Sequence, residues 1–73
     1  MKPLHSETCR THTVDEIRYG IASWDDGSKT MHSVKYTWFD KRGRACRGGE
    51  VPIDALPQML EVAVREGNLQ LQP

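Results

Sequence analysis

The chain has no long run of apolar residues, few cysteines and no net charge. Its 73 residues contain no stretch that approaches the ~18 consecutive apolar residues of a membrane helix. Its two cysteines are too few for a disulfide framework. The polar N-terminus has no apolar segment of the kind found in secretory signals. We therefore expect a cytoplasmic protein with two free thiols and no membrane association.

The sequence also lacks a constellation typical of a catalytic or metal site. A structural zinc site uses four nitrogen or sulfur ligands. His5, Cys9 and His12 supply three at loose spacing, and only the distant His32 or Cys46 could add a fourth. No histidine base lies close in sequence to Cys46, and no glycine-rich phosphate loop is present. We expect no enzymatic activity, no cofactor and no metal.

The overall neutrality conceals a segregation of charge along the chain. Residues 1–28 carry three cations and five anions, whereas residues 29–47 carry six cations and one anion. Residues 48–73 carry one cation and four anions. A basic block between acidic flanks indicates a surface for an anionic partner, either a nucleic acid or an acidic protein patch.

Alternation of side chains predicts a small antiparallel sheet. Residues 17–24 and 31–39 alternate with period two, and glycine-containing turns follow each of them. We expect further short strands over residues 44–47 and 50–53, where Pro52 favours an edge position. One face of each long strand is apolar or aromatic: Ile17, Tyr19 and Ile21 in the first, and Val34, Tyr36 and Trp38 in the second.

A single amphipathic helix is predicted after the strands. Asp54 is a suitable N-cap residue, Pro57 falls in the first turn, and Gly67 follows the last turn. The apolar side chains between them recur at helical spacing: Leu56, Met59, Leu60, Ala63 and Val64. This stripe indicates that the helix lies on one face of the sheet and forms part of the core.

These elements define an α+β fold: a three- to four-stranded antiparallel β-meander followed by one C-terminal amphipathic helix. Residues 1–13 are polar and are expected to form a flexible N-terminal tail. Residues 14–67 form the single domain, and residues 68–73 are a C-terminal tail. We expect a monomer.

The most informative segment spans residues 35–49, where aromatic residues lead into glycines and cations. Single-strand nucleic-acid binders combine these features, and protein interfaces favour Trp, Tyr and Arg as well. A solvated surface that maintains solubility is the alternative. The candidate partner-binding residues are Lys35, Tyr36, Trp38, Lys41, Arg42, Arg44 and Arg47.

Residues 34–60, VKYTWFDKRGRACRGGEVPIDALPQML, resemble the last hairpin and helix of the positive-cofactor-four (p15) coactivator family. The shared features are an aromatic strand, a basic glycine turn, a short apolar strand and an amphipathic helix. This resemblance implies single-stranded DNA binding through a curved sheet. Glu50 stands where that family has a neutral or basic residue, so the chain departs from the pattern there.

In length, charge segregation and lack of catalytic motifs, the whole chain is similar to small transcription regulators of Xanthomonas bacteriophages. That resemblance implies binding to the β′ and β subunits of host RNA polymerase, interference with σ, inhibition of initiation and antitermination. Overall neutrality favours this protein partner, because DNA-binding domains are usually basic as a whole.

Overall fold

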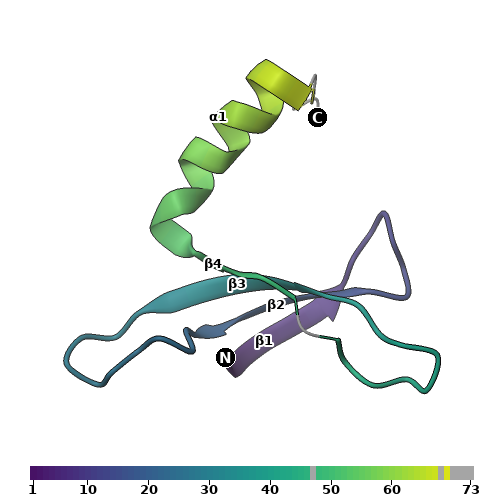
Figure 1. Cartoon of the computed structure of the whole chain (residues 1–73), viewed down its shortest axis with the longest axis horizontal. Coiled ribbons are helices and arrows are strands. Elements are labelled where there is room, and N and C mark those ends of the chain that lie inside the picture. Colours follow the sequence, from purple (N-terminus) through teal and green to yellow (C-terminus); the bar gives the residue numbers. More distant parts are fainter. Residues whose placement is uncertain (47, 68, 70–73) are drawn as a thin grey trace.

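The protein forms one four-stranded antiparallel sheet followed by one helix (Figure 1), which confirms the expected α+β class. The computed structural model describes residues 1–46, 48–67 and 69. The strands lie in the order in which they occur along the chain, so the sheet is a simple meander. They are β1 (Lys2–Thr8), β2 (Glu16–Ile21), β3 (His32–Thr37) and β4 (Glu50–Pro52).

Strands β2 and β3 form the centre of the sheet, and their register joins the two predicted apolar faces. Ile17 pairs with Tyr36, and Tyr19 pairs with Val34. Because paired residues point to the same side, strands β2 to β4 have one mainly polar face and one mainly apolar face. In β1, His5 and Glu7 share the side of the apolar face. The polar face carries Glu16, Arg18, Ser33, Lys35, Thr37 and Glu50. The other, called the aromatic face below, carries Ile17, Tyr19, Ile21, His32, Val34, Tyr36 and Trp38.

The prediction of a flexible tail over residues 1–13 is wrong, because Lys2–Thr8 form strand β1. β1 pairs with β2 over its length and has a bulge between Pro3 and His5. Every residue of this strand is exposed, so backbone hydrogen bonds hold it in place and apolar burial contributes little. The backbones of β1 and β2 lie close together at Gly20, where an added Cβ atom would be 2.1 Å from the carbonyl oxygen of Lys2.

The prediction of a strand over residues 44–47 is also wrong for residues 44–46, the part that the structure describes. Residues 44–46 contain only an isolated bridge, in which Ala45 pairs with Phe39. Arg47 lies outside the described residues. β4 is an edge strand, as Pro52 indicates, and it pairs with β3 over only three residues. Both edges of the sheet are therefore short or interrupted, since β1 carries Pro3 and its bulge.

The predicted helix is confirmed as α1 (Leu56–Gly67). A single 3-10 turn, η1 (Ile53–Ala55), joins it to β4. Asp54 lies within this turn, two residues before α1 begins, so the predicted N-cap role is wrong. At the other end, the backbone N–H of Leu69 donates to the carbonyl oxygen of Ala63 at 3.2 Å. The remaining residues of the predicted C-terminal tail lie outside the described part.

The expected packing of the helix on the sheet does not occur. α1 leaves the β4 edge and extends away from the sheet (Figure 1), and none of its residues is buried. Among the described residues, the only buried hydrophobic ones are Cys9 and Ala22, while Ser33 and Thr37 are fully buried polar residues. Periodicity identified the apolar side of the helix, but the sheet of the same chain does not cover it. No helix in the described ranges has the length and apolar character needed to cross a membrane.

Candidate partner-binding surface

The turn after β3 holds the basic residues in a fixed conformation. The Asp40 carboxylate accepts hydrogen bonds from the backbone N–H groups of Arg42 at 2.8 Å and Arg44 at 3.0 Å. The backbone of Asp40 also bonds to Gly43 and Arg44, and Gly43 adopts a φ of 77°, which favours glycine. The Arg44 N–H, opposed by partial desolvation, holds the pKa of Asp40 below its usual value. We call residues 40–44 the basic turn.

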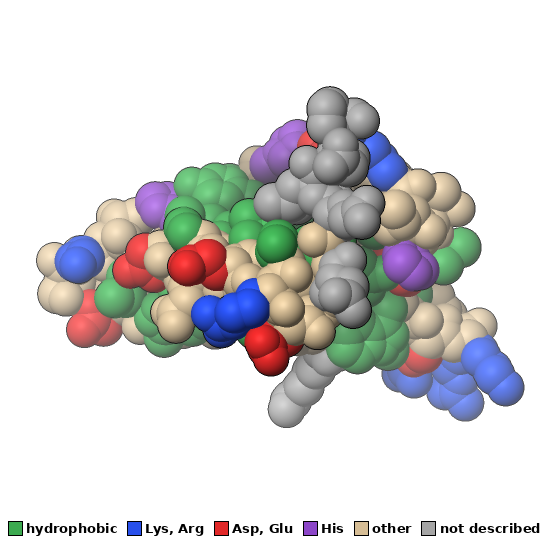
Figure 2. Space-filling view, turned by 90° about the horizontal axis from the view of Figure 1, so that it is seen from above, with side chains coloured by type: hydrophobic (Ala, Val, Ile, Leu, Met, Phe, Trp, Pro, Cys, Tyr) green, Lys and Arg blue, Asp and Glu red, His purple; other side chains and the backbone are tan. Residues whose placement is uncertain are grey.

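Two cations of the basic turn are available to a partner. Lys41 and Arg42 are exposed and form no ion pair with any residue in the described part of the chain. Arg44 is also exposed, but its Nε lies 3.3 Å from Asp40 Oδ2. In the space-filling view, Lys and Arg side chains protrude at one end of the molecule beside hydrophobic ones (Figure 2).

Tyr36 and Trp38 form an open aromatic pair next to this turn. Their ring centroids lie 6.4 Å apart, and the side chains are 37% and 43% exposed. The Tyr36 hydroxyl donates to the Asp15 carboxylate, and this bond raises the pKa of Tyr36 to about 12. The ring of His12 approaches Tyr36 edge-on at 6.4 Å. The structure thus brings together Tyr36, Trp38 and the basic turn. Lys35 points to the opposite, polar face.

A second aromatic pair extends the same face, and the sequence prediction missed it. The rings of Tyr19 and His32 are stacked, with centroids 5.4 Å apart and planes inclined by 4°. Their strands pair with a register that places them on neighbouring positions. The alternation within each strand gave the face of each residue, but only the register between the two strands shows that Tyr19 and His32 are neighbours. The aromatic face therefore runs from His32 to Trp38 along β3.

Glu50, which departs from the p15 pattern, has a structural role. Its carboxylate accepts hydrogen bonds from the Ser33 hydroxyl at 2.9 Å, from the Ser23 backbone N–H at 3.1 Å and from the Ser23 hydroxyl. The amino group of Met1 lies 3.7 Å away. Burial opposes ionisation of Glu50, but the bonds from Ser23 and Ser33 outweigh it and hold the pKa of the carboxyl below its usual value. This residue ties β4 to the neighbouring loop.

The cysteine and histidine residues near the N-terminus do not assemble into a site. Cys9 Sγ lies 3.5 Å from the Thr11 hydroxyl, and the hydroxyl and backbone of Thr11 lower the pKa of this thiol to about 7. His5 bonds to Glu7, and His12 bonds to Thr11. Among the described residues, no three His, Cys, Asp or Glu side chains are grouped closely enough to hold a metal ion. Cys9 and Cys46 are both free.

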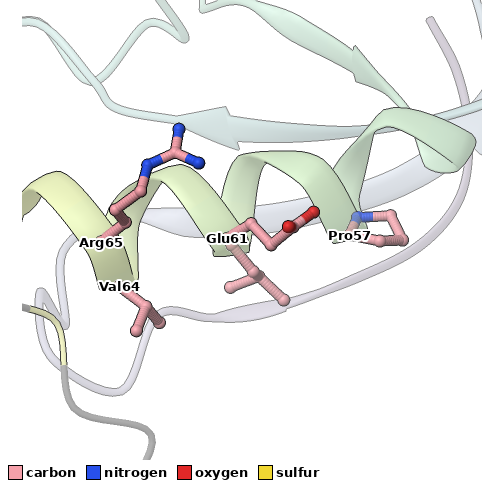
Figure 3. A pocket seen from close by; sticks show the side chains of 5 residues that line it. Pro57, Glu61, Val64 and Arg65 are labelled. Atoms are coloured by element: carbon pink, nitrogen blue, oxygen red, sulfur yellow. The ribbon is translucent and has the colours of Figure 1, made fainter.

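The hollows on the surface are open and shallow. One runs along α1 and is lined by Pro57, Leu60, Glu61, Val64 and Arg65 (Figure 3). Another lies on the same helix beside Met59 and Val62. A third lies at the junction of η1 with the turn before β3, where Trp24, Met31 and His32 meet Ile53. These surfaces suit contact with another macromolecule.

Comparison with known proteins gives no relative: no family model, curated protein sequence or solved structure matches this chain.

Proposed function

We propose that the chain is a non-enzymatic, phage-type transcription regulator that binds the β′ and β subunits of host bacterial RNA polymerase. It acts in the host cytoplasm, interferes with σ and so inhibits initiation, with antitermination as a second effect of the same contact. The observation that carries this proposal is the preorganised basic turn beside the open Tyr36–Trp38 pair. A rigid turn loses little conformational entropy on binding.

The composition of this surface favours a protein partner. Arginine and aromatic residues dominate the energetics of protein interfaces. Lys41 and Arg42 supply charge for an acidic patch, and Trp38 supplies an apolar anchor. The carboxylates of Asp15 and Glu7 belong to the strands and loop that carry the aromatic face, and the chain as a whole is neutral. A phosphate backbone would meet repulsion there, because affinity for nucleic acid depends on net positive charge.

The test is capture of polymerase from a bacterial lysate on the immobilised chain at moderate salt. We expect retention of β′ and β, and we expect the Lys41→Glu, Arg42→Glu double variant to retain about tenfold less, which corresponds to roughly 1.4 kcal/mol. Lys29→Glu is the control, because Lys29 is exposed in the turn at the opposite end of β3. Absence of polymerase subunits from the wild-type eluate would reject the proposal.

A single-stranded nucleic-acid-binding function is the second candidate. The stacked Tyr19–His32 pair and the Tyr36–Trp38 pair on one open sheet face favour it, because bases stack on exposed aromatic rings. This function predicts a gel shift with oligonucleotides that weakens steeply as salt rises. Loss of the shift in a Trp38→Ala variant would assign the contact to the aromatic face.

A further inference from the structure

The single chain exposes far more surface than a folded monomer of its mass. Its accessible area is 6029 Å², whereas a compact 8.3 kDa protein exposes about 4,600 Å². Its radius of gyration is 13.9 Å, against roughly 11 Å for a compact chain of this length. No Leu, Ile, Val, Met or aromatic side chain is buried in the described ranges. The fold in isolation therefore lacks a hydrophobic core.

The exposed apolar area is concentrated on α1. The side chains of Met59, Leu60 and Val64 are 49%, 46% and 43% exposed. They belong to an apolar arc that also includes Leu56 and Ala63, at the spacing of one helix side. The hollow that Leu60 and Val64 line borders this arc (Figure 3). A helix with this pattern is normally stabilised by packing of its apolar side.

The aromatic face of the sheet is the matching surface. Tyr19, Tyr36 and Trp38 are each about two-fifths exposed. Only one end of this face is basic, where Lys41, Arg42 and Arg44 outnumber Asp40 in the basic turn. Its β1 side carries the carboxylates of Glu7 and Asp15. The border of the helix is acidic, because Asp54, Glu61 and Glu66 outnumber Arg65. Each chain thus carries two apolar surfaces, and the basic end of one is complementary in charge to the acidic border of the other. Such a pair of surfaces can form a two-fold symmetric contact.

We propose that two copies of this chain form a symmetric dimer in which the apolar arc of α1 of each copy packs on the aromatic face of the other. A standard interface buries about 800 Å² per partner, and even half of the excess surface of this chain approaches that value. We favour a second copy as the partner because the apolar surfaces need a cover whenever the chain is folded, and another copy of the chain is always present. The lack of net charge also leaves little repulsion between copies. This dimer replaces the monomer expected from the sequence. It also covers Tyr36 and Trp38, the pair that the polymerase proposal uses as its apolar anchor, so polymerase and the second copy compete for one surface. Capture from a lysate tests the first proposal and sedimentation tests the second.

The test is sedimentation equilibrium on the full chain, with variants on the two sides of α1. We expect a mass of twice 8.3 kDa for the wild type. Leu60→Glu places a charge in the apolar arc and should give the mass of one chain. Gln58→Glu introduces the same charge on the other side of the helix and should leave the mass doubled.

A second measurement covers the case in which Leu60→Glu fails to fold. The thermal midpoint of a wild-type dimer falls on dilution, whereas that of a monomer does not change. We expect a clear fall over about a hundredfold dilution. A wild-type mass of 8.3 kDa with a concentration-independent midpoint would overturn the proposal. That result would mean that α1 folds back over the sheet of its own chain in solution.

Discussion

Removing the Glu50 carboxylate should destabilise the fold, because this side chain is largely buried and accepts three hydrogen bonds. In Glu50→Ala the hydroxyl of Ser33, which is fully buried, loses its acceptor. An unpaired buried polar group costs about 1–3 kcal/mol, and hydrogen bonds to a charged group contribute about 1.5–3 kcal/mol. With the two bonds from Ser23 also lost, we expect a decrease of about 3 kcal/mol in the free energy of unfolding. A chain of 73 residues has roughly 4–11 kcal/mol in total.

Urea unfolding followed by circular dichroism measures this effect. Glu50→Gln keeps the size and one acceptor oxygen of the side chain, so its loss should be about half that of Glu50→Ala. Glu7→Gln is the matched control, because Glu7 is exposed on β1 and should leave the urea midpoint unchanged. A Glu50→Ala variant with the wild-type midpoint would refute the structural role that we assign to this carboxylate.

Three further outcomes follow from the structure. The folded-state pKa of Glu50 is below its ordinary value of 4.5, so the stability that this carboxylate contributes is present above that pH and is lost as the pH falls below it. The urea midpoint of Glu50→Gln should therefore change less with acid than that of the wild type. Parallel curves for the two proteins would contradict this. One phenol should ionise near pH 12 in ultraviolet absorbance, and this signal should disappear in Tyr36→Phe and move toward neutrality in Asp15→Asn. Gly20→Ala should lower the free energy of unfolding by about 1–3 kcal/mol, because the added carbon would collide with the Lys2 carbonyl. Hydrogen exchange of the β1 amides should become faster. Unchanged exchange would show that the pairing of β1 with β2 can adjust.

The sequence predicted the centre of the fold because side-chain pattern and structure agree there. The alternation over residues 17–24 and 31–39 marks β2 and β3 and assigns their apolar faces correctly. The apolar repeat between Leu56 and Val64 marks α1 for the same reason. In each case the element is identified by its own side chains, without knowledge of what lies opposite.

The errors arise where backbone pairing or distant contacts decide the structure. β1 has Pro3 and Leu4 as its apolar residues and is held by hydrogen bonds to β2, so no alternation of side chains predicts it. The segment after Gly43 was predicted as a strand, but the bonds between Arg44 and Asp40 use its backbone in a turn. The position of α1 could not be predicted, since periodicity shows which side is apolar and not what covers it.

The candidate surface was predicted in part. Tyr36, Trp38, Lys41, Arg42 and Arg44 were named from composition, and the structure places them around one end of β3. The alternation over residues 31–39 already puts Lys35 on the face opposite Tyr36 and Trp38, and its pairing with Arg18 confirms this. The sequence could not show that Asp40, the lone anion of the block, is what holds the basic turn in shape.

The two edges of the sheet set a limit on how this chain assembles. Pro3 and the bulge after it interrupt the outer side of β1, and Pro52 ends the three-residue strand β4. Neither edge offers the long, flat row of free amide and carbonyl groups along which strands of further chains could add. A two-fold symmetric contact through side-chain surfaces closes after two copies, whereas strand addition continues into fibres. In a protein with so little buried apolar area, these interruptions of the outermost strands work against strand addition.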